Sequence, residues 1–172
     1  MKRIGWFILV SLFSSFLHAA EKEIKPRLAL DHIKVIQVQE NDGDELYFDI
    51  SVLRGEKAKH YFRIPANPTH WPSQLMDKIS NVTLWSEPLK NGETVILIMS
   101  LMESDAKPFN PDDLIGLVRV KLKNVNGVLQ TNWSMPNRYD SPGKNENQKR
   151  NIHKFDMLGE GAHYDVYLSL EK

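Results

Sequence analysis

Hydrophobic side chains recur at every second position in the stretch ELYFDISV, residues 45–52. Leu46, Phe48, Ile50 and Val52 fall on one face of an extended chain, and mostly polar residues fall on the other. A period of two is typical of a β-strand that buries one face. Similar short segments recur along the chain, and none forms a convincing long amphipathic helix. The alternation therefore predicts an all-β protein.

Eight or nine short strands are expected, separated by turns. Prolines between residues 65 and 75 exclude a central strand there, and 75–79 are expected to form a short helical turn. The polar segment 135–151 is expected to be a long exposed loop. This pattern predicts an antiparallel β-sandwich of about eight strands, with a closed barrel as the alternative. The expected strands are 28–38, 45–52, 59–64, 81–85, 93–102, 114–122, 127–133, 152–158 and 163–170.

Two segments depart from simple alternation. Residues 93–102 are apolar on both faces, which predicts a strand covered on both sides near the middle of the sandwich. Their β-branched residues favour a strand over a buried helix. In 114–122 the alternation breaks near Gly116, which predicts a β-bulge.

Residues 1–20 have the layout of a secretory signal peptide. Lys2 and Arg3 precede an apolar run over 4–17, and Ala19 and Ala20 follow it. The run is shorter than the ~20 residues of a membrane-spanning helix, although an uncleaved anchor is the alternative. We therefore expect a signal peptide at 1–20, one domain at 21–172, and a periplasmic or secreted protein.

Charge and composition exclude several classes of function. Without Lys2 and Arg3 the chain has 20 basic and 22 acidic residues, so a nucleic-acid partner is not expected. The absence of cysteine excludes disulfides, thiolate metal sites and cysteine nucleophiles. Neither a G-x-S-x-G elbow nor an H-E-x-x-H spacing occurs. We expect a monomeric protein that is not an enzyme and has no catalytic residues.

Carboxylates are concentrated on both sides of one connection between strands. Glu103 and Asp105 end one predicted strand, and Asp112 and Asp113 begin the next. Both ends of the connection bring carboxylates to the same edge of the sandwich. Oxygen ligands gathered in this way suit Ca²⁺, which takes six to eight of them. Zinc is a poorer fit, because its usual sites use histidine and cysteine.

A second acidic cluster lies between the first two predicted strands. By itself, its Asp-Gly pair is typical of a hairpin turn. Considered with the first cluster, it adds carboxylates from another connection to the candidate calcium site. The members of this cluster are Glu40, Asp42, Asp44 and Glu45.

The segments DELYFDI (44–50) and DDLIGLVRVKL (112–122) resemble the C2 domain, a calcium- and phospholipid-binding β-sandwich. The final predicted strand, HYDVYLSL, is similar to the last strand of that family. The resemblance implies calcium ligands at Asp44, Glu103, Asp105 and Asp113. Asp42, Glu45 and Asp112 would be supporting or alternative ligands. Glu103 stands where the family usually has aspartate, and the loop from Asp105 to Asp113 is longer than usual.

The resemblance implies a non-catalytic binding module that uses Ca²⁺ to bind a phospholipid surface or a protein partner, and the signal-peptide layout implies that it is exported. Lys107 and Phe109 at the tip of the acidic loop would either meet a lipid surface or fold back over the sandwich. The alternative is a metal-free interaction protein, such as an envelope component, an inhibitor or a virulence-type factor.

Overall fold

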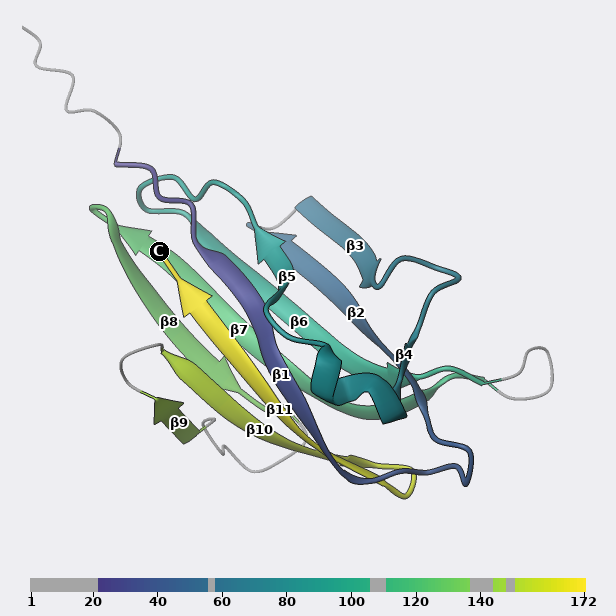
Figure 1. Ribbon diagram of the computed structural model, residues 1–172. Helices are drawn as coiled ribbons and strands as arrows, with labels where there is room; N and C mark the ends of the chain where they lie inside the picture. The colour runs from purple at the N-terminus through teal and green to yellow at the C-terminus, as the bar shows by residue number, and fades with distance from the viewer. Residues whose placement is uncertain (1–21, 56–57, 106–110, 137–143, 148–150) are drawn as a thin grey trace, which may run out of the picture.

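The protein is a β-sandwich of two antiparallel sheets packed against each other (Figure 1). The computed structural model describes residues 22–55, 58–105, 111–136, 144–147 and 151–172. The predicted fold class is confirmed, and the closed barrel is wrong because the strands form two separate sheets. The predicted signal peptide lies outside the described residues, as do Lys107 and Phe109. In the described part, no helix is long and apolar enough to span a membrane.

The first sheet has the strand order β5-β1-β11-β10-β9. Its centre is formed by β1 and β11, which are far apart in sequence and pair antiparallel along most of their lengths. The first and last strands of the described chain therefore lie side by side in the same sheet. The bounds are β1 (Arg27–Gln37), β5 (Val82–Ser86), β9 (Lys144–Asn147), β10 (Ile152–Gly159) and β11 (Ala162–Glu171).

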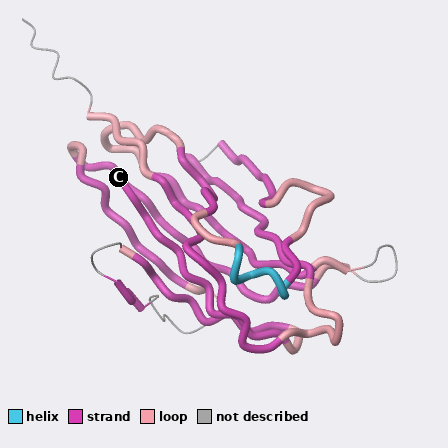
Figure 2. Tube along the Cα trace, viewed as in Figure 1, coloured by secondary structure: helices cyan, strands magenta, loops and turns pink. Residues whose placement is uncertain are grey.

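The second sheet has the order β3-β2-β6-β7-β8, and the short β4 pairs with the start of β2. A 3₁₀ helix, η1 (Ser73–Lys78), follows β4 and is the helical segment in Figure 2. It confirms the predicted helical turn. The bounds are β2 (Glu45–Arg54), β3 (Ala58–Ile64), β4 (Trp71–Pro72), β6 (Thr94–Glu103), β7 (Asp113–Val125) and β8 (Val128–Ser134).

The core lies between the sheets and is made by the alternate positions that the sequence pattern indicates. Phe48 and Ile50 of β2 are fully buried, as are Tyr164 and Val166 of β11. Each strand buries one face because successive side chains point to opposite sides. Burial of these apolar side chains is the main force holding the two layers together.

Two glycines allow the sheets to approach closely where β7 meets β10. A Cβ added at Gly116 would lie 2.9 Å from the Cβ of Met157. A Cβ added at Gly159 would lie 2.5 Å from the carbonyl oxygen of Leu114. The β6–β7 register shifts opposite this point, which confirms the predicted bulge near Gly116. The two glycines place the start of β7, with its carboxylates, against the first sheet.

Two sequence expectations are wrong. The segment 135–151 was expected to be a loop, but it contains β9, which adds to the edge of β10. On β6, Val95, Leu97 and Met99 are fully buried, whereas Ile96 and Ile98 on the other face are only half-buried. No second layer covers that face in the described part of the chain. A strand can thus be apolar on both faces without lying between two layers.

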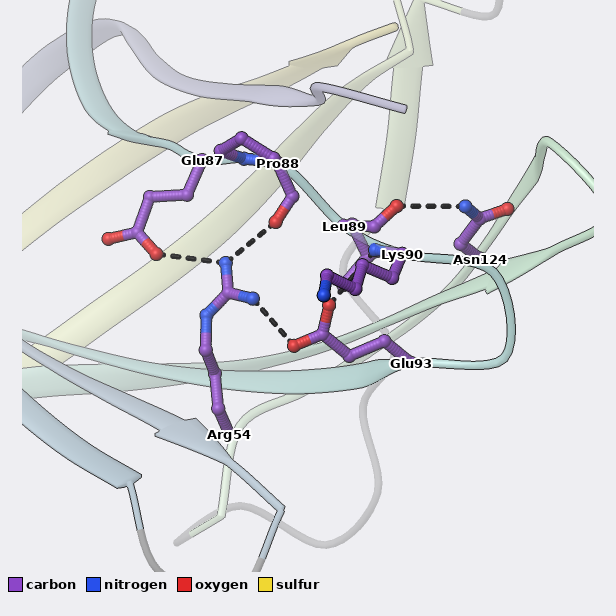
Figure 3. A network of polar contacts seen from close by, with 7 residues as sticks. All are labelled: Arg54, Glu87, Pro88, Leu89, Lys90, Glu93 and Asn124. Atoms are coloured by element: carbon purple, nitrogen blue, oxygen red, sulfur yellow. Dashed lines mark hydrogen bonds and ion pairs between the residues drawn. The ribbon is translucent and has the colours of Figure 1, made fainter. Parts of the chain in front are cut away.

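A polar network ties the end of β2 to the connection between β5 and β6 (Figure 3). Arg54 Nη1 lies 2.6 Å from Glu93 Oε1, and Arg54 Nη2 lies 2.8 Å from Glu87 Oε2. Nη2 also donates to the carbonyl of Pro88. Fully buried Asn124 donates to the carbonyl of Leu89 at 2.8 Å. The network fixes the β5–β6 connection. This connection lies at the end of the sandwich opposite to the one that carries the acidic residues.

Candidate metal centre at the acidic corner

The two acidic clusters meet at one end of the sandwich, where the β1–β2 connection approaches the ends of β6 and β7 (Figure 1). The backbone N–H of Ser104 donates to the carbonyl of Glu45 at 2.9 Å. Gln39 Nε2 donates to Asp113 Oδ2 at 2.7 Å. We call the group Gln39, Asp44, Glu103, Asp105 and Asp113 the acidic corner. The common corner predicted from the sequence is therefore present.

Glu103 is the buried carboxylate of this corner. It is the last residue of β6 and falls on the inward face, so only 1% of its surface is exposed. Its Oε1 is 3.5 Å from the N–H of Glu45, and its Oε2 is buried with no hydrogen-bond partner. Burial, together with the negative charge of Asp105, raises the pKa of Glu103 to about 7. A positive ion in the corner would relieve both effects.

Asp105 and Asp113 complete a compact carboxylate group with Glu103. One oxygen from each of the three side chains lies within 4.8 Å of the others. Oδ2 of Asp105 is also buried without a hydrogen-bond partner. Two oxygens on one Ca²⁺ ion lie at most about 5 Å apart, since each is ~2.3–2.6 Å from the metal. The three carboxylates are therefore close enough to share one ion.

Gln39 belongs to the corner although its role was not predicted. Its amide nitrogen binds Asp113, and its amide oxygen Oε1 is buried without a hydrogen-bond partner. A carboxamide oxygen is an ordinary calcium ligand. The available sequence signal was its position, because Gln39 directly precedes the acidic residues of the β1–β2 connection.

Asp44 lies in the corner, but its oxygens already have protein donors. The side chain is fully buried, and Oδ1 accepts from the N–H groups of Gln39 at 2.9 Å and Glu40 at 3.0 Å. Oδ2 accepts from the hydroxyl of Tyr164. Asp44 thus holds the β1–β2 connection in shape in this conformation. Its predicted role as a calcium ligand stays a prediction.

The backbone of Asp44 is anchored as firmly as its side chain. Its N–H donates to Ser73 Oγ at 2.9 Å, and its carbonyl accepts from the N–H of Ser73 at 2.8 Å.

Burial, and then the hydrogen bond to Asp44, raise the pKa of the Tyr164 hydroxyl well above its usual range. Tyr164 therefore stays protonated and acts as a permanent donor to Asp44.

Asp112 stands beside the corner and is oriented by Tyr47. The Tyr47 hydroxyl donates to Asp112 Oδ2 at 2.7 Å, and the Arg63 guanidinium carbon lies 3.5 Å from the Tyr47 ring centroid. The N–H of Asp105 also points to Asp112 Oδ1, at 3.3 Å. Burial and then Asp112 raise the pKa of Tyr47 above its usual range. Asp112 thus supports the loop end next to Asp105.

Asp42 and Glu45, the other predicted supporting ligands, are exposed. The carbonyl of Asp42 accepts a hydrogen bond from Gln74 of η1. Neither side chain is in the compact carboxylate group of the corner. Their predicted supporting role remains a prediction.

The donor set of the corner fits a hard cation. It consists of carboxylate oxygens and one amide oxygen, two of the carboxylates having buried oxygens that lack a hydrogen-bond partner. The group contains no histidine, which zinc would favour. Calcium accepts an all-oxygen set with flexible geometry, so the residues present fit Ca²⁺.

A second group of potential ligands lies on the first sheet, where Asp156, His163 and Asp165 come together. This group already has internal charge partners. Lys154 Nζ is 2.8 Å from Asp165 Oδ2, and His163 Nε2 contacts Asp156. An ammonium group in this position competes with a metal ion, so we do not assign a metal site here.

Neither a scan against protein-family models nor a search of curated proteins finds a match for this chain. The C2 resemblance therefore stays a prediction from the residues.

Proposed function

We propose that this protein is an exported, non-catalytic binding module whose acidic corner takes a Ca²⁺ ion. Glu103, Asp105 and Asp113 would hold the ion, with the amide oxygen of Gln39 beside them. Through this corner the module would bind a phospholipid surface or a protein partner. Asp44 would act mainly by holding the β1–β2 connection in place.

The observation that carries this proposal is the buried, unpartnered Oε2 of Glu103. A buried polar atom without a partner costs roughly 1–3 kcal/mol, and more when it is charged. Most buried polar atoms in folded proteins have a partner. Oδ2 of the neighbouring Asp105 is also buried without a partner, so a second unfavourable free-energy contribution of the same kind falls on the corner. A cation would satisfy both oxygens at once.

Binding of the ion would have two consequences for the chain. It would offset the repulsion among the carboxylates, which would stabilise the ends of β6 and β7. Calcium also accepts more ligands than the corner supplies, so a phosphate or carboxylate of a partner can complete its shell. The proposed partner class therefore carries an anionic oxygen group.

Thermal melting with added Ca²⁺ tests the proposal. At a calcium concentration of 100 times Kd we expect a gain of about 2.7 kcal/mol, which raises Tm by roughly 5–10 °C. The double variant Asp105→Asn/Asp113→Asn should lose the shift. The double variant Asp77→Asn/Glu160→Gln, which changes two exposed acids elsewhere, should keep it. Calorimetry without heat of binding, together with an unchanged Tm, would contradict the proposal.

A second candidate function, a metal-independent interaction protein, is favoured by the outer face of the second sheet. This face has an apolar centre that no second layer covers in the described part of the chain. Basic residues of β7 and β3 flank it, and Asp49 of β2 lies on the same face beside Arg63. The apolar centre consists of Leu53, Ile96, Ile98, Met102, Leu114 and Leu117. The basic residues are Lys59, Arg63, Arg119, Lys121 and Lys123.

The charge on this face favours an acidic protein partner. Two copies of the same basic face would repel each other, which opposes a symmetric dimer. Ser51 and Ser100 lie between the apolar residues, and hydrocarbon could not satisfy their hydroxyls. An acidic protein surface with apolar side chains can match both features.

A photo-crosslinking residue placed at Ile98 tests this second function. The reaction is carried out with Ca²⁺ and again in excess chelator. The expected result is a covalent adduct with a protein whose contact segment is acidic, and no adduct from the same residue placed at exposed Glu160. Adducts that disappear in chelator would favour the calcium-dependent function. Adducts between two copies of the chain, or with lipid, would contradict an acidic protein partner.

A further inference from the structure

A cavity of ≈ 670 Å³ lies on the first sheet, among residues that take no part in the acidic corner. Asp31 and His32 come from β1, and Ser169 comes from β11. Asn81 and Asn151 lie just before β5 and β10. The cavity is within the ~300–1,000 Å³ range of small-molecule sites. Among the described residues, its lining consists of Asp31, His32, Ser80, Asn81, Asn151, Ser169, Leu170 and Glu171.

Hydrogen bonds hold one wall of the cavity in place. Arg27 Nη2 donates to the carbonyl and to Oδ1 of Asn81 at 3.0 and 2.8 Å, and Nη1 donates to Glu171 Oε2 at 3.0 Å. Arg27 Nε donates to Thr83 Oγ1 at 2.8 Å. The N–H of Asn81 also donates to the carbonyl of Asp31 at 3.1 Å. The guanidinium group of Arg27 thus fixes Thr83 of β5, Glu171 of β11 and Asn81, which directly precedes β5.

The opposite wall is also held by its neighbours. Asn151 Nδ2 donates to the carbonyl of Leu170 at 3.4 Å, and Asn151 Oδ1 is 3.1 Å from His153 Nε2. The floor contains Ser169, which is only 6% exposed. Groups that are fixed before binding lose little conformational entropy when a ligand arrives.

The charged side chains at the cavity already have hydrogen-bond partners within the protein. Glu171 pairs with Arg27, and Asp31 Oδ2 is 2.8 Å from His32 Nδ1. An anionic ligand would meet two carboxylates, whereas a metal ion would meet a guanidinium and an imidazole already paired with those carboxylates. Leu170 is the one apolar residue in the described lining, so an apolar ligand would gain little. A neutral polar ligand remains as the class that fits.

The lining supplies both donors and acceptors for such a ligand. Carboxylates accept, hydroxyls and carboxamides do both, and imidazole does either. His32 adds a flat ring, which is stacked on Tyr167 with centroids 4.0 Å apart and planes 13° apart. Sugars combine many hydroxyl groups with apolar C–H faces that pack against such rings.

We propose that this cavity is a binding site for a neutral saccharide. His32 would contact a face of the sugar ring, and Asp31, Asn81 and Ser169 would bind its hydroxyls. Arg27 would act as a positioning residue by holding Asn81 and Glu171. The site is independent of the acidic corner, so it does not require calcium.

Titrations followed by amide NMR of the protein test the proposal, with glucose, galactose, mannose, N-acetylglucosamine and maltose as probes. At least one probe should shift the amides of 31–32, 80–81 and 169–171, with Kd of about 1 mM or tighter. Ser169→Leu, which fills the floor, should weaken binding at least about tenfold. Ser134→Leu, the same change on β8, should leave binding unchanged.

His32→Ala provides a second variant, because this half-exposed side chain can be removed without disturbing the core. The His32→Ala variant should also bind sugar more weakly, whereas His60→Ala, at an exposed position of β3, should not. The proposal is overturned if none of the five sugars shifts these amides. It is also overturned if binding is equal in the cavity variants, or if inorganic phosphate or Ca²⁺ produces the same shifts.

Discussion

The hydroxyl of Tyr164, in the last strand, donates a hydrogen bond to the carboxylate of Asp44, in the first connection between strands. Both side chains are fully buried. The contact joins the first sheet to the loop that leads into the second sheet. It therefore fixes the β1–β2 side of the acidic corner, although 120 positions separate the two residues.

Tyr164→Phe should destabilise the fold by about 2–3 kcal/mol, because it removes a donor from a buried carboxylate without creating a cavity. Urea unfolding measures the change. Tyr61→Phe is the matched control, since Tyr61 is 63% exposed, and it should cost about 0.5 kcal/mol or less. Equal losses in the two variants would show that the Asp44 contact contributes nothing special.

The stability of the calcium-free protein should depend on Glu103 between about pH 4.5 and pH 7. Its pKa is raised from 4.5 to about 7 in the folded state, so the folded protein binds the proton more tightly than the unfolded chain. This contribution is fully present below pH 4.5 and is lost as the pH rises through 7. It amounts to at most about 3 kcal/mol.

Glu103→Gln should remove this dependence, because the amide has no charge to bury. Unfolding in excess chelator at pH 5, 6, 7 and 8 measures it for both proteins. Glu45→Gln, an exposed neighbour, should retain the slope of the unchanged protein. A Glu103→Gln protein with the same pH slope as the unchanged protein would contradict the argument.

Gly159→Ala should destabilise the sandwich by about 1–3 kcal/mol, because the added methyl group would overlap the carbonyl oxygens of Leu114 and Ile115. Denaturant unfolding measures the effect. Ser100→Thr also adds one methyl group to a strand, but on a half-exposed face, and should change stability by about 0.5 kcal/mol or less. A neutral Gly159→Ala would mean that the sheets can separate there at no cost.

Arg54→Met should destabilise the protein by about 1–2 kcal/mol at neutral pH, since it leaves Glu87 and Glu93 without their cation. Burial of Glu93 opposes its charge, but the N–H of Lys90 and the Arg54 guanidinium outweigh this and lower its pKa. A lowered carboxyl pKa contributes stability above pH 4.5 that is lost as the pH falls through the folded value.

The cost of Arg54→Met should therefore shrink in acid, and thermal melts at pH 7 and pH 3 measure the difference. Lys25→Met, at an exposed position, should cost little at either pH. A cost that does not change with pH would indicate lost packing of the arginine stem as the cause.

Local sequence signals predicted most of the candidate corner. Glu103, Asp105 and Asp113 flank one connection, and their shared location follows from the antiparallel return of the chain. The roles of Gln39 and Tyr164 were missed, because the sequence around a single glutamine or an inward-facing tyrosine does not indicate which distant residue its side chain contacts. Asp44 was recognised as acidic, but the donors to its oxygens appear only when β11 is packed beside it.

The sequence by itself determined most of the strands and the buried face of those that alternate, because alternation is a local property of the extended chain. The short strands β4 and β9 carry no such pattern and were not predicted. It did not determine what covers the second face of 93–102, since apolar side chains look the same whether or not a layer lies above them. Tertiary structure alone decided that β1 pairs with β11 and that Glu103 points inward with an unpartnered oxygen. Those features depend on contacts between distant segments, which local patterning does not encode.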